Sequence, residues 1–305
     1  MSARHEPVLV RETLAFVQPG GGLHLDATLG DGGHAFALLS ADPEVRLLAC
    51  DRDLEALAFS RQRLAPFGGR VTFAYATFSE LPNAHREAGG ELLAGALFDF
   101  GLSSRQIDDP SRGMSFMHEG PLDLRMDASR GESLSQRLTH TEPAELARVL
   151  REYGDLRGAG RLARAILSEH QAGRLNGTRA LAAVVERTLG DSRPGTLAPV
   201  FQALRIWVND EFAHVDAALE WLPSAMRDGG VVVTLSYHSG EDRRVKLALR
   251  PAPRLDVRRR PVVEDASTSA WEELTRRVVV PSEEEQSSNP RARSARLRAF
   301  RRRPR

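Results

Sequence analysis

The sequence predicts an α/β fold built on a parallel, doubly wound sheet. Strand-like and helix-like segments alternate through the first third of the chain, and this alternation is typical of βαβ units. After the strand-like segment 95–101, the next convincing strand is 229–239, although a crossover between parallel strands needs only about a dozen residues. We therefore expect an insertion to interrupt the sheet after its fourth strand.

Two sequence patterns predict the elements of this fold. Short apolar runs such as "GLHLDA" and "VRLLACD" are typical of buried strands, and "DLEALAFSRQRLAPF" has the apolar spacing of a helix. The expected strands are 22–27, 45–51, 70–78, 95–101 and 229–239, with weaker candidates near 255–258 and 277–281. The expected helices are 34–40, 53–67, 79–89 and a segment that ends near Leu249.

The expected insertion is helical. Its segments "TEPAELARVLREYG", "RLARAILSEHQAG" and "TRALAAVVERTLG" carry apolar residues at a spacing of three and four. Thr141 and Thr178 stand where an N-cap is expected. The segment 201–226 is expected to be one long helix that returns to the sheet. These patterns predict a discontinuous catalytic domain, 1–106 with 201–305, and an inserted helical domain, 107–200.

Composition excludes several protein classes. Apolar residues make up 41% of the chain, but no run of about 18 of them is present, so we expect no transmembrane helix and no membrane partner. The segment "MSARHEPVLVRETL" lacks the apolar core of a signal peptide. Cys50 is the only cysteine, which excludes an intrachain disulfide and a cysteine-rich zinc site. No metal is expected, and a cytoplasmic location fits this cysteine content.

Positive charge is unevenly distributed along the chain. The formal net charge is only +1, but the last twenty residues, "QSSNPRARSARLRAFRRRPR", hold eight arginines and no acid. A basic segment of this kind often contacts nucleic acid. The alternative is a solvated, disordered end, and composition alone does not decide between the two.

A glycine-rich bend follows the first expected strand. "DATLGDGGHA" contains Gly30, Gly32 and Gly33, which can adopt a positive φ or let the backbone approach a ligand. A strand, such a bend and a helix start form a nucleotide-binding corner. The pattern D-x-x-x-G-x-G-G lacks the third glycine of the G-x-G-x-x-G pattern of nicotinamide enzymes. The acid before the glycines instead suits S-adenosylmethionine, whose amino-acid end needs polar partners.

Three acids are expected at the same edge of the sheet. Asp26, Asp51 and Asp99 each end an expected strand, and open α/β sheets bind ligands at the carboxyl ends of their strands. Asp51 is placed to accept hydrogen bonds from ribose hydroxyls. Together with the glycines, these acids favour a ligand site over a simple turn.

Eight sequence blocks carry a resemblance to a known family. They are "HEPVLVRETL", "DATLGDGGHA", "DRD", "FDFGLSSRQIDDPSRGMSF", "GPLDLRMD", "FQALRIWVNDE", "SYHSGEDRRVK" and "NPRARSARLR". In this order they resemble, nearly end to end, the bacterial ribosomal RNA small-subunit methyltransferase H family, also called MraW. The resemblance implies a class I (Rossmann-like) S-adenosylmethionine-dependent methyltransferase with an inserted helical domain. It also implies methyl transfer to N4 of a cytidine in the decoding centre of 16S rRNA, within the small ribosomal subunit.

The resemblance further implies which residues contact the cofactor. Asp51 would hold the ribose, and an aromatic ring at Phe78 could flank adenine, with core packing as its alternative role. The chain departs from the family at Phe98, where an aliphatic residue is usual, and at Gly240, where a leucine is usual. The implied cofactor contacts are Gly32, Gly33, His34, Asp51, Phe78, Asp99 and Gln106.

The catalytic residues follow from the chemistry of the acceptor. The N4 amine of cytosine is a poor nucleophile because its lone pair is delocalised into the ring, so a positioned group must accept its proton. We expect Asp99 to be this acceptor, with Ser103 and Ser104 as alternatives. "DFGLSS" lacks the Pro-Pro-Tyr of many DNA amino-group methyltransferases, which weakens a DNA substrate.

Further residues are expected to contact the RNA. His238 in "SYHSGEDR" follows the fifth strand and could contact the base or a phosphate, although a lone histidine is more often structural. Asn289, Arg291 and Arg293 of "NPRARS" are expected to fold back near the site or to meet RNA. The inserted domain is expected to share RNA recognition through Arg148, Arg151, Arg161 and Arg164.

Three other functions stay open on the sequence alone. A nicotinamide oxidoreductase is opposed by the missing third glycine, and a small-molecule methyltransferase would not explain the basic tail. An RNA-binding assembly factor without catalysis is opposed by the intact glycines and Asp51. A homodimer also stays open, because the sequence does not determine the oligomeric state.

Overall fold

The chain forms two compact units. The structure is a computed structural model that describes residues 7–17, 20–250 and 269–304. Unit 1 comprises Met1–Gly101 and Ala213–Arg305, and unit 2 comprises Leu102–Phe212.

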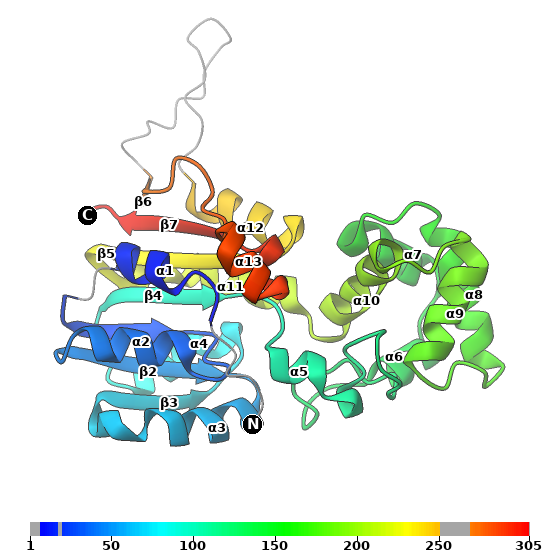
Figure 1. The fold of residues 1–305 in the computed structure, drawn as a ribbon, viewed down its shortest axis with the longest axis horizontal. Helices are drawn as coiled ribbons and strands as arrows, with labels where there is room; N and C mark the ends of the chain where they lie inside the picture. The colour runs from blue at the N-terminus through cyan, green and yellow to red at the C-terminus, as the bar shows by residue number, and fades with distance from the viewer. Residues whose placement is uncertain (1–6, 18–19, 251–268, 305) are drawn as a thin grey trace, which may run out of the picture. The chain divides into compact units, whose positions relative to one another are not determined.

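Unit 1 contains a seven-stranded sheet with the strand order β3-β2-β1-β4-β5-β7-β6 (Figure 1). Strands β1 to β5 are parallel, and β7 lies antiparallel between β5 and β6. Nearly every residue of β2 and β4 is buried, as expected where helices cover both faces of a parallel sheet. The bounds are β1 Gly22–Asp26, β2 Val45–Asp51, β3 Val71–Tyr75, β4 Leu93–Asp99, β5 Met226–Ser236, β6 Trp271–Glu273 and β7 Arg296–Arg302. The predicted α/β fold is confirmed.

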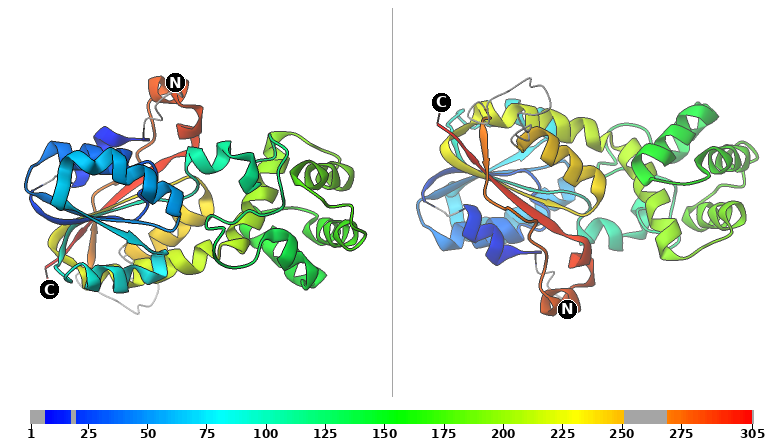
Figure 2. Two further views of the ribbon diagram at one scale, coloured as in Figure 1. Left: turned by 90° about the horizontal axis from the view of Figure 1, so that it is seen from below. Right: turned by 90° about the horizontal axis from the view of Figure 1, so that it is seen from above.

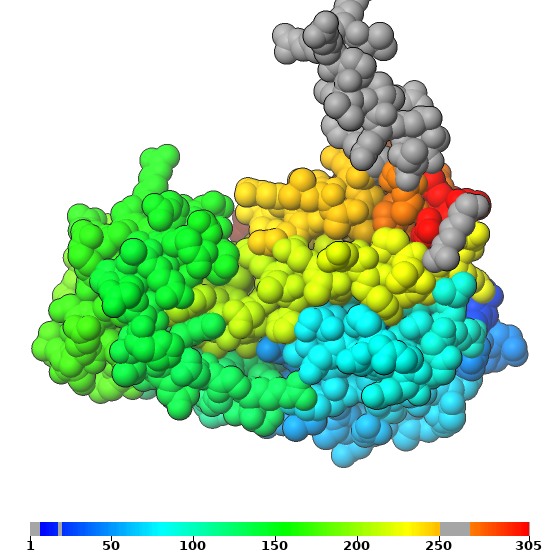
Figure 3. Space-filling model, turned by 180° about the vertical axis from the view of Figure 1, so that it is seen from behind, coloured from blue at the N-terminus to red at the C-terminus, as the bar shows by residue number. Residues whose placement is uncertain are grey.

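Helices cover both faces of this sheet (Figure 2). Helices α1, α2 and α3 pack on one face around an apolar core that includes Leu38 and Leu57. Helices α4, α11 and α12 pack on the other face, around a core that includes Leu81 and Val245, and they lie side by side in cyan, yellow and gold in Figure 3. The bounds are α1 Val10–Val17, α2 Gly33–Ala41, α3 Leu54–Leu64, α4 Leu81–Glu87, α11 Glu211–Ala225 and α12 Ser239–Leu249.

The arginine-rich segment at the C-terminal end is part of the sheet. Strand β7 pairs with β5 from Ser236↔Arg296 to Val231↔Arg301, and its apolar residues Leu297, Ala299 and Phe300 are buried. The interpretation of this segment as a solvated, disordered end is therefore wrong for residues 296–302. The reason is that apolar side chains pack into the cores on both faces of the strand, while Arg298 and Arg301 pair with acids.

Two weaker strand candidates have different outcomes. The candidate at 277–281 contributes only an isolated bridge between Val279 and Leu297, so the prediction of a strand there is wrong. The short strand that does pair with β7 is β6, which the sequence did not predict. The candidate near 255–258 lies outside the described residues.

Unit 2 is built from helices around an apolar core of its own. Helix α10 packs against α6 and α7, which groups residues up to Val208 with unit 2, beyond the expected domain boundary at residue 200. The prediction of one helix over 201–226 is wrong, because the chain turns at Asp210, whose φ is 48°. None of the described helices is long and apolar enough to cross a membrane. The bounds are α5 Ser104–Asp108, α6 Leu134–Thr139, α7 Pro143–Gly154, α8 Ala159–Gln171, α9 Thr178–Leu189 and α10 Pro194–Val208.

The two threonines expected as N-caps have other roles. The N-caps of α7 and α9 are Glu142 and Gly177. The Thr141 hydroxyl donates a hydrogen bond to the backbone oxygen of Arg137 at 2.6 Å. The Thr178 hydroxyl donates to the backbone oxygen of His118 at 2.6 Å. Both threonines fasten a helix start to a preceding segment, so the prediction of N-caps is wrong.

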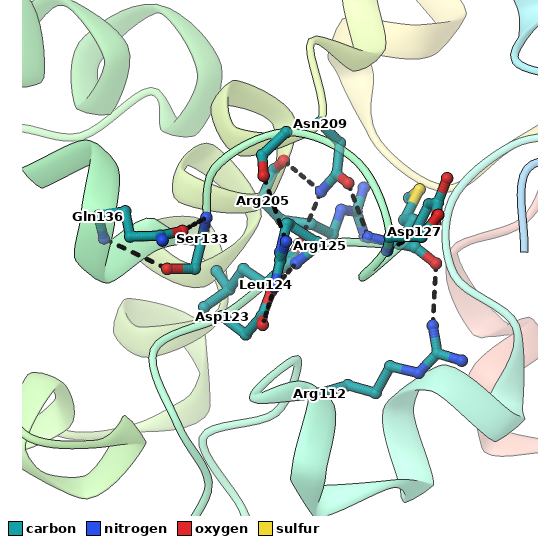
Figure 4. A network of polar contacts seen from close by, with 12 residues as sticks. Arg112, Asp123, Leu124, Arg125, Asp127, Ser133, Gln136, Arg205 and Asn209 are labelled. Atoms are coloured by element: carbon teal, nitrogen blue, oxygen red, sulfur yellow. Dashed lines mark hydrogen bonds and ion pairs between the residues drawn. The ribbon is translucent and has the colours of Figure 1, made fainter.

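Asn209 fastens a long loop within unit 2 (Figure 4). Its Oδ1 accepts a hydrogen bond from the Met126 backbone nitrogen, and its Nδ2 donates to the Leu124 backbone oxygen, each at 2.7 Å. Leu124 has a φ of 61°, a conformation that costs energy for leucine. The loop also requires Gly113, because a Cβ there would lie 1.9 Å from the Pro121 oxygen. The blocks "GPLDLRMD" and "FQALRIWVNDE" thus meet in the folded chain.

Candidate cofactor site

A glycine-rich bend joins β1 to α2 at the carboxyl edge of the sheet. Gly30 and Gly32 have φ values of 49° and 71°, in the left-handed region that favours glycine. Gly33 begins α2, and a Cβ there would lie 2.7 Å from Cγ of Pro7. The Ser60 hydroxyl donates to the Gly30 oxygen at 2.6 Å. Two glycines are thus required by backbone conformation and the third by close packing.

Asp51 ends β2 with its carboxylate held by the backbone. Its Oδ2 accepts a hydrogen bond from the Gly30 nitrogen, and its Oδ1 accepts one from the Asp53 nitrogen, each at 2.8 Å. Burial raises the pKa of Asp51 to about 6, although both hydrogen bonds favour the charged form. Each carboxylate oxygen keeps a further lone pair, so the fixed side chain can still accept hydrogen bonds from ligand hydroxyls.

Asp99 ends β4 and is held by groups from two other segments of unit 1. The Tyr237 hydroxyl donates a hydrogen bond to Asp99 Oδ1 at 2.8 Å, and the Asp99 nitrogen donates to the Thr28 hydroxyl at 2.7 Å. Burial raises the pKa of Asp99 to about 7, and Glu241 acts in the same direction. Burial also raises the pKa of Tyr237, so this hydroxyl stays a donor.

His34 lies in the first turn of α2 and is buried, with 8% of its surface exposed. Neither ring nitrogen forms a hydrogen bond with any part of the chain that the structure describes. Its Nε2 lies 3.7 Å from Asp99 Oδ2, and burial lowers the pKa of His34 to about 4. A neutral, buried imidazole with unsatisfied polar atoms is costly. This arrangement therefore fits a polar ligand group beside His34.

Asp26, Asp51 and Asp99 form a cluster of carboxylates, here called the acid cluster, in which Asp26 is buried and Asp51 and Asp99 are half-buried. Burial raises the pKa of Asp26 to about 7, and the nearby charges of Asp99 and Asp51 raise it further. No lysine or arginine forms an ion pair with these three acids within the described ranges. Buried carboxylates without a cation are unfavourable, and a positively charged ligand would stabilise their charged forms. Cys50 directly precedes Asp51 and is buried. Burial raises the pKa of its thiol, so the thiol is unreactive.

Phe78 lies in an aromatic cluster next to the end of β3. Its ring centroid is 5.7 Å from that of Phe98 and 5.8 Å from that of Phe100, both in edge-to-face geometry. Such pairs stabilise a core beyond the area that they bury. Phe78 is only partly buried, so it serves core packing and keeps a surface that a ligand could contact. Phe98, the departure from the family pattern, fills this cluster and is fully buried.

Three predicted site residues lie in unit 2. Ser103 is the N-cap of α5 and Ser104 is its first residue. The Ser103 hydroxyl accepts a hydrogen bond from the Gln106 nitrogen at 3.2 Å, and Gln106 Oε1 accepts one from the Ser103 nitrogen at 3.1 Å. This reciprocal pair is a capping box. Gln106, which sequence alone would place at the surface, is buried.

His238 is the N-cap of α12. Its Nδ1 accepts a hydrogen bond from the Glu241 nitrogen at 3.4 Å, and its Nε2 lies 3.1 Å from Glu241 Oε1. Both ring nitrogens therefore contact the same glutamate, which is the structural role that a lone histidine commonly has. Gly240, the other departure from the family pattern, lies within the first turn of α12.

Asn289, Arg291 and Arg293 lie in unit 1 on the way to β7. Asn289 follows α13 (Glu283–Ser288), and the other two belong to a short 3-10 helix, Pro290–Ser294. Both arginines are exposed. Their contact with RNA remains a prediction.

Two residues of the site were missed by the sequence reasoning. Tyr237 and Thr28 contact Asp99. Neither was predicted, because both lie in motifs where the glycines, acids and histidines were the candidate ligand contacts. Their positions at strand ends offered a signal, since Tyr237 directly follows β5 and Thr28 lies two residues after β1.

Comparison with known proteins identifies the family. The pattern of the MraW methylase family matches residues 2–303. The chain belongs to the MraW methylase family. The cofactor of this MraW methylase is S-adenosylmethionine, as the resemblance implied, and the positive charge of that cofactor fits the acid cluster.

Relatives of this MraW methylase align along nearly the whole chain. The ribosomal RNA small subunit methyltransferase H of Sorangium cellulosum (strain So ce56) is 43% identical over 303 residues, covering 98% of this chain and 91% of the relative. The protein of the same name from Solidesulfovibrio magneticus is 40% identical over 315 residues, covering 98% and 96%. A solved structure of a putative rRNA-methylase from Clostridium thermocellum is a remote likeness, with a TM-score of 0.44 and 12% identity over 98% of this chain and 100% of that chain.

Proposed function

We propose that this methylase transfers a methyl group from S-adenosylmethionine to N4 of a cytidine in the decoding centre of 16S rRNA. The observation that carries the proposal is the near full-length similarity, at 38–43% identity, to relatives named ribosomal RNA small subunit methyltransferase H. The cytidine N4 target rests on the resemblance of the eight sequence blocks. The small ribosomal subunit is the proposed partner.

The proposed cofactor site is the carboxyl edge of the sheet in unit 1. S-Adenosylmethionine carries a sulfonium and an ammonium group, and the acid cluster offers carboxylates without basic partners among the described residues. Asp51 would accept hydrogen bonds from the ribose, and Phe78 would contact the adenine. The backbone at Gly32 and Gly33, with the His34 ring, would approach the amino-acid end. Gln106 is a proposed cofactor contact on the strength of the family resemblance alone.

The proposed chemistry needs positioning and a proton acceptor. When bound, S-adenosylmethionine supplies a methyl group that its sulfonium already activates. The bond between N4 and the methyl carbon forms as the carbon–sulfur bond breaks, and the electron pair of that bond goes to sulfur. The amine nitrogen must then lose a proton. Asp99 would accept it, because a pKa near 7 is close to the pH at which a proton acceptor works best. Ser103 and Ser104 are the alternative acceptors.

The RNA is proposed to be held by unit 2 together with residues of unit 1. The helices of unit 2 carry many exposed arginines, and none of these helices contributes to the sheet or to the acid cluster. His238, Asn289, Arg291 and Arg293 are the proposed contacts from unit 1. The target base would have to be unstacked before it could reach the methyl donor.

One experiment tests the proposed function directly. The protein would be incubated with radiolabelled cofactor and either naked 16S rRNA or purified small subunits, and the label would be mapped to a nucleotide and an atom. We expect label on N4 of a single cytidine. Asp99→Asn serves as the matched inactive control, because it keeps the shape of the side chain. Label on another atom, or on no RNA, would contradict the proposal.

A further inference from the structure

The α8 arginine face is a set of three exposed residues in unit 2: Arg157, Arg161 and Arg164. Arg157 lies two residues before α8, and Arg161 and Arg164 lie in its first two turns. Residues three apart share one side of a helix, which places Arg161 and Arg164 together, and Arg157 directly precedes the N-cap Gly158. The three positive charges therefore gather around one helix end.

The position of the Arg164 guanidinium supports this grouping. Its Nη1 lies 3.8 Å from the place that a Cβ on Gly160 would take. The side chain thus folds back over the first turn of α8, in the direction that helical side chains prefer. Arg161 lies in the same turn, so the Arg164 guanidinium folds back towards the turn that carries Arg161.

No acidic group neutralises this face within the described ranges. Arg157, Arg161 and Arg164 form no ion pair and no hydrogen bond through their side chains there, and the first turn of α8 contains no acidic residue. The N-cap is Gly158, which has no side chain to cap the helix. The partial positive charge of a helix N-terminus adds to the three formal charges.

Most other exposed arginines of unit 2 differ because they have an acidic partner; among the described residues Arg151, in α7, has none but lies outside this face. This difference separates Arg148 from Arg161 and Arg164, with which the sequence had grouped it. The pairs are Arg148–Glu152 at 2.9 Å, Arg174–Glu169 at 2.8 Å, Arg187–Glu169 at 3.6 Å, Arg179–Glu119 at 3.6 Å and Arg193–Asp191 at 2.9 Å.

We propose that the α8 arginine face binds phosphates of the substrate RNA backbone. The proposal rests on the proposed function and names the part of unit 2 that holds the RNA. Guanidinium groups bind phosphate oxygens in a bidentate way, and arginines that have no acidic partner need not break an ion pair first. Phosphate contacts position a nucleic acid without selecting its sequence, so this face contributes affinity rather than choice of base.

The test compares two triple variants that remove the same charge. One is Arg157→Ala with Arg161→Ala and Arg164→Ala, and the matched control is Arg174→Ala with Arg179→Ala and Arg187→Ala. The affinity of the full-length protein for naked 16S rRNA would be measured across a salt series. Each lost phosphate contact flattens the log–log salt dependence by roughly 0.7–0.9, so we expect the first variant to flatten it by about two. The control should change it by less than half as much.

Three readouts separate the outcomes. Normal thermal melting and unchanged cofactor affinity must accompany the loss of RNA affinity, since the face lies in unit 2 and not in the acid cluster. Equal flattening in both variants would assign the effect to net charge and overturn the proposal. Unchanged affinity for naked RNA with weakened binding to whole small subunits would assign the face to a protein contact and also overturn it. If the wild type methylates the RNA while the first variant keeps full affinity, only this inference is wrong. If the wild type methylates no RNA, the proposed function itself is wrong.

Discussion

The acid cluster of unit 1 and the α8 arginine face of unit 2 each gather three like charges without an opposite partner among the described residues. They differ in burial, and burial decides what each can bind. Desolvation raises the pKa values of Asp26, Asp51 and Asp99, so their charge depends on pH and suits a small cation that binds beside them. The arginines are exposed to water and remain charged at every physiological pH, so they suit a large anion and respond to salt.

The largest expected effect tests the chemical role of the acid cluster. Asp99→Asn should lower the rate of methyl transfer at saturating cofactor by roughly a hundredfold to ten-thousandfold, the usual contribution of a positioned proton acceptor. Single-turnover labelling of 16S rRNA would measure it. Tyr237→Phe is the control, because it removes the hydrogen bond to Asp99 but leaves the carboxylate, and its effect should be smaller. A near-normal rate for Asp99→Asn would move the acceptor to Ser103 or Ser104.

A smaller effect is expected when the cluster loses its contact with the ribose. Asp51→Ala should weaken cofactor binding by roughly tenfold to a hundredfold, because a hydrogen bond to a charged group contributes about 1.5–3 kcal/mol. Calorimetry on the folded variant would measure it, with RNA affinity as the control, since the α8 arginine face lies in unit 2. Unchanged cofactor affinity in a variant that melts normally would remove Asp51 from the site.

The smallest effect is expected from pH, and it separates the two regions most cleanly. Protonation removes the carboxylate charge that favours a cation, so cofactor affinity should fall as the pH drops through about 7 for Asp26 and Asp99 and about 6 for Asp51. Linkage predicts a loss of roughly tenfold between pH 8 and pH 6 for one fully coupled group. His34 stays neutral in this range, because its pKa is about 4.

RNA binding by the α8 arginine face should, by contrast, not depend on pH. The share that the α8 arginine face contributes should stay constant from pH 8 to pH 6, because arginine does not titrate there. Isothermal titrations at several pH values would measure cofactor affinity, and the two triple variants would report the RNA contribution. A cofactor affinity that is independent of pH would mean that the acid cluster does not face the positive charges of the ligand.

Local sequence patterns predicted the five parallel strands but not β7. An apolar run such as "VRLLACD" predicts a buried strand, because a strand covered on both faces needs apolar side chains on both. In "RLRAFRR" the arginines dominate the composition, and their partners are far away in the sequence. Arg298 pairs with Asp242 and, at 3.3 Å, with Glu273. A charged residue buried against distant acids gives no local sign of burial.

The acids of the candidate site were predictable from the sequence, but the residues that hold them were not. The positions of Asp51 and Asp99 followed from the rule that strand ends share one edge of the sheet. The hydrogen bond between Tyr237 and Asp99 spans 138 residues, so no spacing could reveal it. The absence of acidic partners on the α8 arginine face is likewise a property of the fold, because arginines with and without partners look alike in the sequence.

The place of β7 between β5 and β6 has a consequence for how the chain matures. During synthesis, β5 emerges well before residues 296–302, and until they arrive one of its edges has unpaired backbone groups. Such an edge can pair with another nascent chain and start aggregation. Pairing between distant segments is also slow, because the intervening loop must close first. Completion of the sheet therefore depends on a late segment, which Arg298 helps to hold in place by pairing with Asp242 and Glu273.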